Sequence, residues 1–135
     1  MQNESDPGRA GALKGISEST AAEILAFRDD RRWMPFHNPK DLAMSVAIEA
    51  GELLEVFQWS GADLECGDKR GALADELADV LIYAAMLADR AGLSMDAVVR
   101  EKLAKNAARY PVEKVAGLGS ESYLQCKAEG RGRRS

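Results

Sequence analysis

The chain has 135 residues, which is enough for one ordinary domain with a hydrophobic core. Its 46% hydrophobic and 30% charged residues are typical of a globular protein, and no apolar run reaches the roughly 18 residues of a membrane-spanning helix. The net charge of −4 argues against a surface built to hold nucleic acid, and no secretion signal opens the chain, so we expect a cytoplasmic protein.

The first part of the chain divides into a leader and a helix. Residues 1–16 contain mostly Gly, Pro, Ser, Asn and charged side chains, which predicts a flexible leader. A first helix is predicted over residues 18–33. Its apolar spacing places Ile24 and Phe27 inward and Arg28 in water.

Three further helices are predicted from their end signals. Asn38 can cap the free amides of a second helix over residues 39–59. A third helix over residues 68–91 ends where Gly92 supplies a left-handed stop. A fourth helix covers residues 94–110, and no strand pattern of comparable length appears, so the predicted class is all-α.

The predicted domain organisation follows from these helices. They form one catalytic domain over residues 17–115, and three of them are apolar enough to require a partner copy. Residues 116–135 are rich in Gly and Ser and are expected to be an irregular or disordered tail. The basic end of this tail is interpreted as solvated, and no specific contact with nucleic acid is expected.

Acidic side chains stand at three-residue steps on two of the predicted helices. Glu49 and Glu52 project from adjacent turns on one side of the second helix. Glu76 and Asp79 repeat the step on the third helix, where residues 72–87 include no basic side chain. Carboxylates that face one another repel unless a cation compensates them, so a metal site is one interpretation. A solvated acidic helix face is the other, and spacing alone does not decide between them.

The residue types around these acids narrow the choice of metal. His37 is the single histidine of the chain, and the two cysteines, Cys66 and Cys126, are too few and too far apart for a metal-binding cluster. The ligands typical of zinc and di-iron sites are therefore not expected near these acids. An all-oxygen ligand set fits Mg²⁺ best, with Mn²⁺ as the second candidate.

The fourth predicted helix carries a row of phosphate-binding residue types. Lys102, Asn106 and Arg109 follow at steps of four and three on one face, and Tyr110 comes next. Such a row is common on surfaces. Paired with an acidic metal site it makes chemical sense, because a divalent ion bridges phosphates while basic groups neutralise the remaining charge.

These motifs in this order resemble the all-α nucleoside triphosphate pyrophosphohydrolase superfamily, which includes MazG, dimeric dUTPases and phosphoribosyl-ATP pyrophosphohydrolase. The resemblance covers residues 20–115 and is closest to the dCTP pyrophosphatase branch. It is carried by the segments 36–42, 49–59, 75–83 and 102–112.

The resemblance implies a four-helix MazG-like bundle, usually a homotetramer built as a dimer of dimers. It implies hydrolysis of a (deoxy)nucleoside triphosphate between the α- and β-phosphates, giving the monophosphate and pyrophosphate. The implied catalytic and Mg²⁺-binding residues are Glu49, Glu52, Glu76 and Asp79. The implied phosphate and sugar contacts are Lys102, Asn106, Arg109 and Tyr110. The implied base pocket consists of Trp33, His37 and Trp59, for which ordinary packing and loop anchoring are the alternative interpretations.

The expected mechanism assigns roles to two groups of side chains. The carboxylates orient a water and help to deprotonate it for attack on phosphorus. Lys102 and Arg109 stabilise charge on the leaving pyrophosphate. Glu55, one turn beyond Glu52, is a candidate general base or a solvent-facing residue.

The expected substrate is dCTP or a modified cytosine nucleotide, with a role in nucleotide-pool house-cleaning. The preference should be graded, because stacking discriminates poorly and only His37, Asn38 and backbone are obvious polar groups for the base edge. Two departures from the branch bear on this expectation: the first helix lacks a histidine, and residues 116–126 replace the usual short ending. The alternatives are dUTP, a damaged nucleotide or phosphoribosyl-ATP as substrate, or a non-catalytic helical interaction module.

Overall fold

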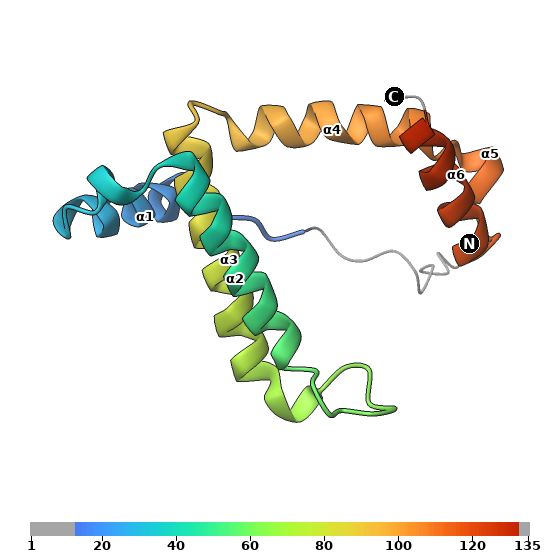
Figure 1. The fold of residues 1–135 in the computed structure, drawn as a ribbon, viewed down its shortest axis with the longest axis horizontal. Coiled ribbons are helices and arrows are strands. Elements are labelled where there is room, and N and C mark those ends of the chain that lie inside the picture. The colour runs from blue at the N-terminus through green and yellow to red at the C-terminus, as the bar shows by residue number, and fades with distance from the viewer. Residues whose placement is uncertain (1–12, 133–135) are drawn as a thin grey trace, which may run out of the picture. The chain divides into compact units, whose positions relative to one another are not determined.

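The structure is a computed structural model that describes residues 13–132. Its elements, in chain order, are α1 (Glu18–Asp30), η1 (Met34–Phe36), α2 (Pro39–Glu55), η2 (Gly67–Lys69), α3 (Arg70–Arg90), α4 (Met95–Arg109), α5 (Val112–Val115) and α6 (Ser120–Gly132) (Figure 1). The described residues contain no strand, which confirms the all-α class. None of their helices combines the length and the apolar character needed to cross a membrane.

The chain divides into two compact units, of which the first ends at Leu87 and the second begins at Ala88. The first unit contains α1, α2 and nearly all of α3, and the second contains α4, α5 and α6. The predicted leader over residues 1–16 lies largely outside the described residues. The predicted domain limits at residues 17 and 115 stay predictions.

The helix ends signalled in the sequence are present in the structure. The Oδ1 atom of Asn38 accepts a hydrogen bond from the amide of Asp41 at 2.9 Å, which caps α2. The Ser94 hydroxyl accepts from the amide of Ala97 at 3.2 Å and caps α4. Gly92 has a φ of 66°, the left-handed conformation expected after α3.

Two of the predicted helices are too long at their C-terminal ends. α1 ends at Asp30 instead of residue 33, and Arg32 just beyond it has a φ of 53°. α2 ends at Glu55 instead of residue 59, and the turns that follow lead to Trp59 at a φ of 68°. A left-handed residue ends a right-handed helix, and no glycine marks either place in the sequence.

The predicted irregular tail is wrong for the last described helix. α6 forms where the Gly and Ser content predicted disorder, and it contacts both α4 and α5. Cys126 is buried on its inner face, and the Tyr123 ring stacks on Tyr110 with a centroid distance of 5.2 Å. Tertiary packing therefore stabilises a helix whose own sequence is a weak helix former.

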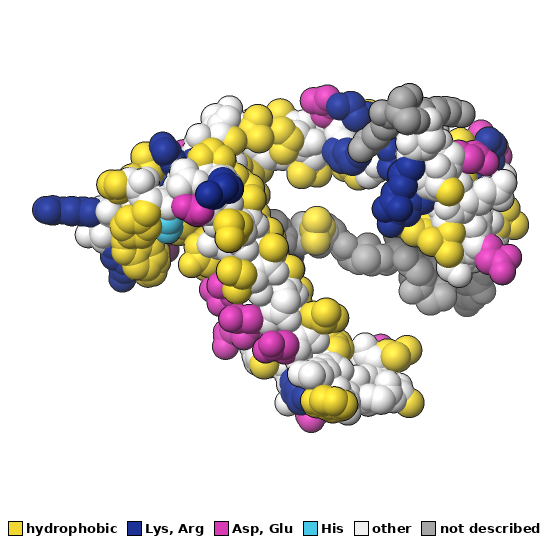
Figure 2. Space-filling view, in the orientation of Figure 1, with side chains coloured by type: hydrophobic (Ala, Val, Ile, Leu, Met, Phe, Trp, Pro, Cys, Tyr) yellow, Lys and Arg dark blue, Asp and Glu magenta, His cyan; other side chains and the backbone are white. Residues whose placement is uncertain are grey.

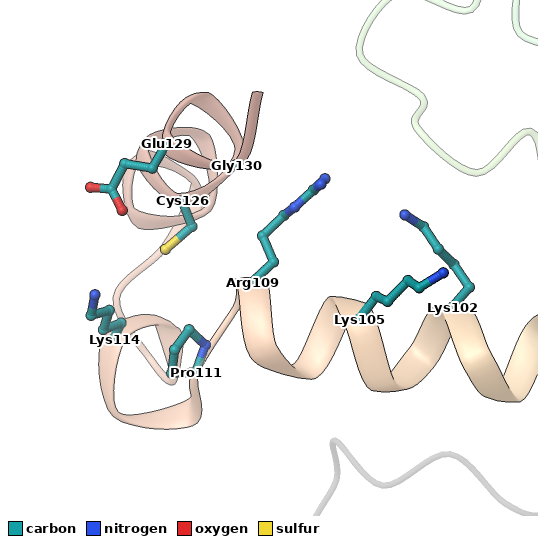
Figure 3. Close-up of a pocket in the computed structure, with 8 residues that line it drawn as sticks. All are labelled: Lys102, Lys105, Arg109, Pro111, Lys114, Cys126, Glu129 and Gly130. Atoms are coloured by element: carbon teal, nitrogen blue, oxygen red, sulfur yellow. The ribbon is translucent and has the colours of Figure 1, made fainter. Parts of the chain in front are cut away.

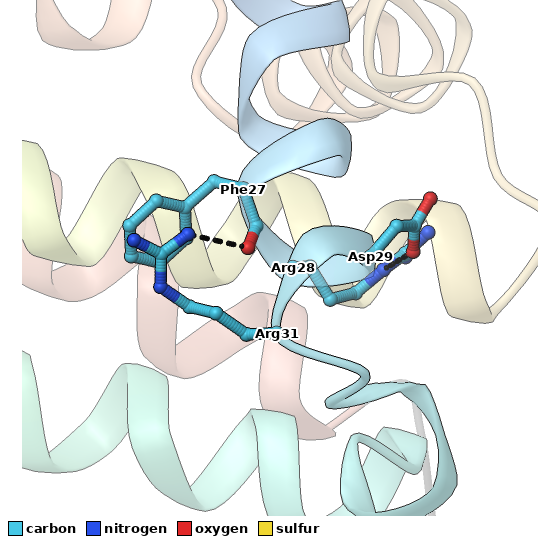
Figure 4. Close-up of polar contacts among 4 residues, drawn as sticks. All are labelled: Phe27, Arg28, Asp29 and Arg31. Atoms are coloured by element: carbon cyan, nitrogen blue, oxygen red, sulfur yellow. Dashed lines mark hydrogen bonds and ion pairs between the residues drawn. The ribbon is translucent and has the colours of Figure 1, made fainter.

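The first unit has a small core built from three helices. Ile24 of α1, Leu42 of α2 and Met86 of α3 form its buried cluster. Arg28 was predicted to lie in water, but only 4% of its surface is exposed, and its Nε atom pairs with the Asp29 carboxylate at 2.8 Å (Figure 4). The ion pair compensates the guanidinium for its partial loss of water.

Many apolar side chains lie outside this core. On α2 and α3 the large exposed ones are Met44, Ile48, Leu54, Leu77 and Leu81. Figure 2 shows hydrophobic side chains distributed over the visible face of these helices. Exposed apolar surface of this extent is typical of an interface with another chain.

We predict that Leu42→Ala destabilises the protein, because Leu42 is only 1% exposed at the centre of the core cluster. Removing a buried leucine side chain costs about 2 to 5 kcal/mol of unfolding free energy. Urea unfolding at a fixed protein concentration measures this loss. Leu13→Ala is the matched control, since Leu13 is 97% exposed and its truncation should change stability by less than about 0.5 kcal/mol. Equal effects of the two changes would contradict the assigned core.

Candidate active site

Three carboxylates from two helices converge in the first unit. Glu49 lies on α2, and Glu76 and Asp79 lie on adjacent turns of α3. Each contributes an oxygen atom within 4.8 Å of the oxygens of the other two. Figure 2 shows acidic side chains gathered along the α2 and α3 segment. The structure thus brings Glu49 close to two acids that lie 27 and 30 positions further along the sequence.

Two oxygens of this cluster are buried without a hydrogen-bond partner. They are the Oε2 atoms of Glu49 and Glu76. Burying an acceptor without a donor is costly, and burying a negative charge without compensation costs more. A cation supplies the missing interaction, so the donor set fits a hard divalent ion that prefers oxygen ligands.

The pKa shifts within the cluster also indicate a site that a cation would stabilise. Burial raises the pKa of Glu49, and the charges of Glu52 and Asp79 raise it further. Burial likewise raises the pKa of Glu76, followed by the charge of Glu52 and a hydrogen bond with it. All four predicted acids therefore act on one another. Each proton that the cluster retains would be displaced by a bound cation.

A cavity of about 360 Å³ adjoins the acidic cluster. It is lined by Thr20, Glu23, Ile24, Phe27, Trp33, Asp79, Ile82, Tyr83 and Met86. The α1 residues and the α3 residues each follow the spacing of one helix face, so the cavity lies between those two faces. Asp79 belongs to both the cavity and the carboxylate cluster. A ligand in the cavity therefore lies beside the candidate metal site.

Aromatic rings form one wall of this cavity. The rings of Phe27 and Trp33 meet edge to face at a centroid distance of 5.6 Å. The Arg31 guanidinium lies 3.6 Å from the centroid of the Phe27 ring and donates a hydrogen bond to the Phe27 carbonyl (Figure 4). Trp33, one of the three residues predicted for a base pocket, lines this cavity. Phe27 was predicted to face inward, but 44% of its surface is exposed, and its place in the cavity lining was not predicted.

The other two predicted base-pocket residues lie elsewhere. His37 is buried among the rings of Trp33, Phe36 and Tyr83 at centroid distances of 5.6, 5.5 and 6.4 Å, and it does not line the cavity. Burial and the nearby Arg28 charge lower its pKa, so the neutral imidazole is favoured. Trp59 is 91% exposed and also does not line the cavity. The geometry of His37 is that of an anchor for the segment between α1 and α2.

A second cavity, of about 320 Å³, lies within the second unit (Figure 3). It is lined by Lys102, Lys105, Arg109, Pro111, Lys114, Cys126, Glu129 and Gly130. Lys102 and Arg109 were predicted to share a face, and the structure adds two further lysines to them. Asn106 and Tyr110 do not line this cavity, and the ring of Tyr110 stacks on Tyr123 instead.

The helix α6 closes one side of the basic cavity at a glycine. A Cβ atom at Gly130 would lie 2.6 Å from the Nε atom of Arg109. A larger residue at this position would require the Arg109 side chain to move away from α6 (Figure 3). The sequence held no signal for this contact, because the tail was predicted to be irregular.

Comparisons with known proteins identify the family to which this helical chain and its acidic cluster are similar. The sequence model of the MazG-like family matches residues 44–123. The dCTP pyrophosphatase 1 of Homo sapiens is 38% identical over 130 residues, which cover 89% of this chain and 75% of that protein. The Rattus norvegicus protein of the same name is 37% identical over 119 residues, which cover 81% and 69%.

The fold comparison agrees with the sequence comparison. A crystal structure of a pyrophosphatase from Archaeoglobus fulgidus matches with a TM-score of 0.65 and 37% identity, over 76% of this chain and 99% of that chain. The family match covers more than half of the chain and includes all four acids of the cluster. The chain therefore belongs to the MazG-like family.

Proposed function

We propose that this protein is a divalent-metal-dependent nucleoside triphosphate pyrophosphohydrolase that converts dCTP to dCMP and pyrophosphate. The observation that carries the proposal is the cluster of Glu49, Glu76 and Asp79, whose oxygens lie within 4.8 Å of one another beside an aromatic cavity. The curated relatives named dCTP pyrophosphatase 1 support the substrate. The corresponding role is removal of dCTP or modified cytosine nucleotides from the cytoplasmic pool.

Glu49, Glu76 and Asp79 are the residues that would hold the ion, with Glu52 adding negative charge beside them. Their all-oxygen set suits Mg²⁺ first and Mn²⁺ second. When bound, a divalent cation neutralises phosphate charge and lowers the pKa of a nearby water.

The side chains of the protein account for the remaining steps. A carboxylate of the cluster orients the attacking water and accepts its proton. The water oxygen bonds to the α-phosphorus while the bond from that phosphorus to the bridging oxygen breaks, which releases pyrophosphate. Lys102 and Arg109 line the basic cavity, and we propose that they neutralise charge on the leaving group.

The aromatic cavity would receive the base. A ring such as Trp33 contributes about 1–3 kcal/mol by stacking on a nucleobase. Because Asp79 also lines the cavity, a base held there keeps its phosphates near the carboxylates. The proposed base site therefore consists of α1, α3 and the segment that carries Trp33.

We also propose that the protein is a homotetramer, a dimer of dimers of four-helix bundles. The described part of the first unit buries few large side chains, while Ile48 and Leu81 are 59% and 40% exposed. A symmetric assembly would cover this apolar surface.

The cluster predicts which acids are essential for turnover. Glu76→Gln keeps the size of the side chain but removes a ligand charge, so we expect at least about a hundredfold loss of kcat for dCTP at saturating Mg²⁺. Release of pyrophosphate measures the rate. Asp75→Asn is the matched control, because Asp75 is exposed on the same helix and is not one of the three converging acids. Wild-type activity in Glu76→Gln would show that the metal site is assigned wrongly.

Acidification should weaken cation binding, because Glu49 and Glu76 have raised pKa values in the cation-free protein. A carboxyl group must lose its proton to bind the ion, so affinity holds above these pKa values and falls as pH drops through them. The fall is about tenfold per pH unit for each proton displaced.

Calorimetry with Mn²⁺ alone, from neutral pH down to the ordinary glutamate value of 4.5, measures this dependence. Repeating it in buffers of different ionisation enthalpy counts the protons released. Glu65→Gln, an exposed residue outside the cluster, should behave like the wild type. An affinity that stays constant over this pH range would refute the coupling.

The exposed apolar face predicts a change in assembly. Ile48→Gln combined with Leu81→Gln places polar groups on two helices, so sedimentation should show smaller species than the wild-type tetramer. Leu13→Gln controls for the chemistry of the substitution, because Leu13 is 97% exposed outside the helices. Circular dichroism verifies that the variants stay helical. A wild-type protein that sediments as a monomer at micromolar concentration would rule out the proposed assembly.

A further inference from the structure

The aromatic cavity contains few groups that could identify a base. Most of its lining is apolar or aromatic, and the residues with polar side-chain atoms besides Trp33 are Thr20, Glu23, Asp79 and Tyr83. Asp79 belongs to the carboxylate cluster and would contact the ion. The Tyr83 ring packs against His37. The first turns of α1 therefore supply the polar groups that have no other assigned role.

His37 and Asn38, the polar side chains that the sequence suggested for the base edge, do not line the cavity. Both side-chain polar atoms of Asn38 contact Asp41: Oδ1 accepts from its amide at 2.9 Å, and Nδ2 donates to its carboxylate at 2.7 Å. His37 is buried among three aromatic rings and does not line the cavity. A hydrogen bond to the base edge must come from another residue.

Glu23 has the position that such a residue needs. It is exposed, it precedes the buried Ile24 on α1, and it lies one turn before Phe27. All three residues line the cavity, so the carboxylate lies at the edge of the space that the aromatic wall encloses. Within residues 13–132, Glu23 forms no hydrogen bond or ion pair that would occupy its oxygens.

We propose that Glu23 is a specificity-determining residue that accepts a hydrogen bond from the amino group at C4 of cytosine. The inference rests on the proposed function, because it places the base of dCTP in the aromatic cavity. It adds to that function a physical reason for the choice of base. Thr20, which lines the same edge, can donate or accept and therefore discriminates less.

The chemistry of the two pyrimidine types explains the selection. An ionised carboxylate only accepts hydrogen bonds, and the C4 amino group of cytosine donates them. Uracil and thymine present a carbonyl oxygen at C4, so two acceptors would face each other without a proton between them. A site that pairs with a substrate group rejects an analogue that lacks it far more strongly than an apolar pocket does. Stacking on Trp33 would be similar for all these bases.

The test compares dCTP with dUTP as substrates of the full-length protein with Mg²⁺. Glu23→Gln nearly preserves shape but offers an amide donor that can pair with the C4 carbonyl of uracil. We expect the ratio of kcat/KM for dCTP to that for dUTP to fall at least tenfold, with an improvement for dUTP. Glu23→Ala removes the acceptor without adding a donor, so it should lower kcat/KM for dCTP and leave dUTP unimproved.

Glu18→Gln is the matched control, since Glu18 is an exposed glutamate of α1 that does not line the cavity, and its ratio should equal that of the wild type. A ratio unchanged in Glu23→Gln, or equal losses for both substrates, would overturn the role of Glu23 while leaving dCTP hydrolysis intact. If the wild type releases no pyrophosphate from any nucleotide, the proposed function fails instead. Calorimetric binding of dCMP and dUMP then tests the cavity separately: tighter binding of dCMP that Glu23→Gln abolishes supports the inference, and equal binding overturns it.

Discussion

Repulsion among carboxylates on α2 and α3 is the constraint on which the rest of the proposed site depends. Glu49 and Glu76 each bury an oxygen without a donor, and the neighbouring acids raise the pKa of both. Folding holds these groups together because apolar contacts elsewhere on the same helices fix the positions of the backbones. The unfavourable interaction is useful, since a cation that relieves it gains affinity from the strain it removes.

The distribution of apolar residues supports the proposed assembly of more than one chain. The core cluster of the first unit is small, and large apolar side chains remain exposed on the helices that carry the acids. A second copy packed against those faces would restrict the motion of α2 and α3 and keep the carboxylates aligned. Assembly and catalysis would then depend on the same two helices.

The sequence predicted the parts of this protein that local chemistry decides. A helix cap such as Asn38 and a helix stop such as Gly92 act within one turn. The sequence therefore predicted the helices that begin or end at these residues. Three-residue steps placed the acids on common faces, and the structure brings those faces together. What could not be predicted depends on contacts between distant segments. The order of α6, the burial of Arg28 and the position of Glu23 beside α3 all arise from tertiary packing.

The double membership of Asp79 has a geometric consequence. It belongs to the carboxylate cluster, and the cavity continues from it along the same face of α3 as far as Met86. Seven residues of helix span about 10 Å, and the backbone hydrogen bonds make that length nearly invariant. The α3 helix would therefore fix the distance between the bound base and the phosphate that reacts. The site would then select a ligand by the distance between its base and its phosphates as well as by the chemistry of these two groups.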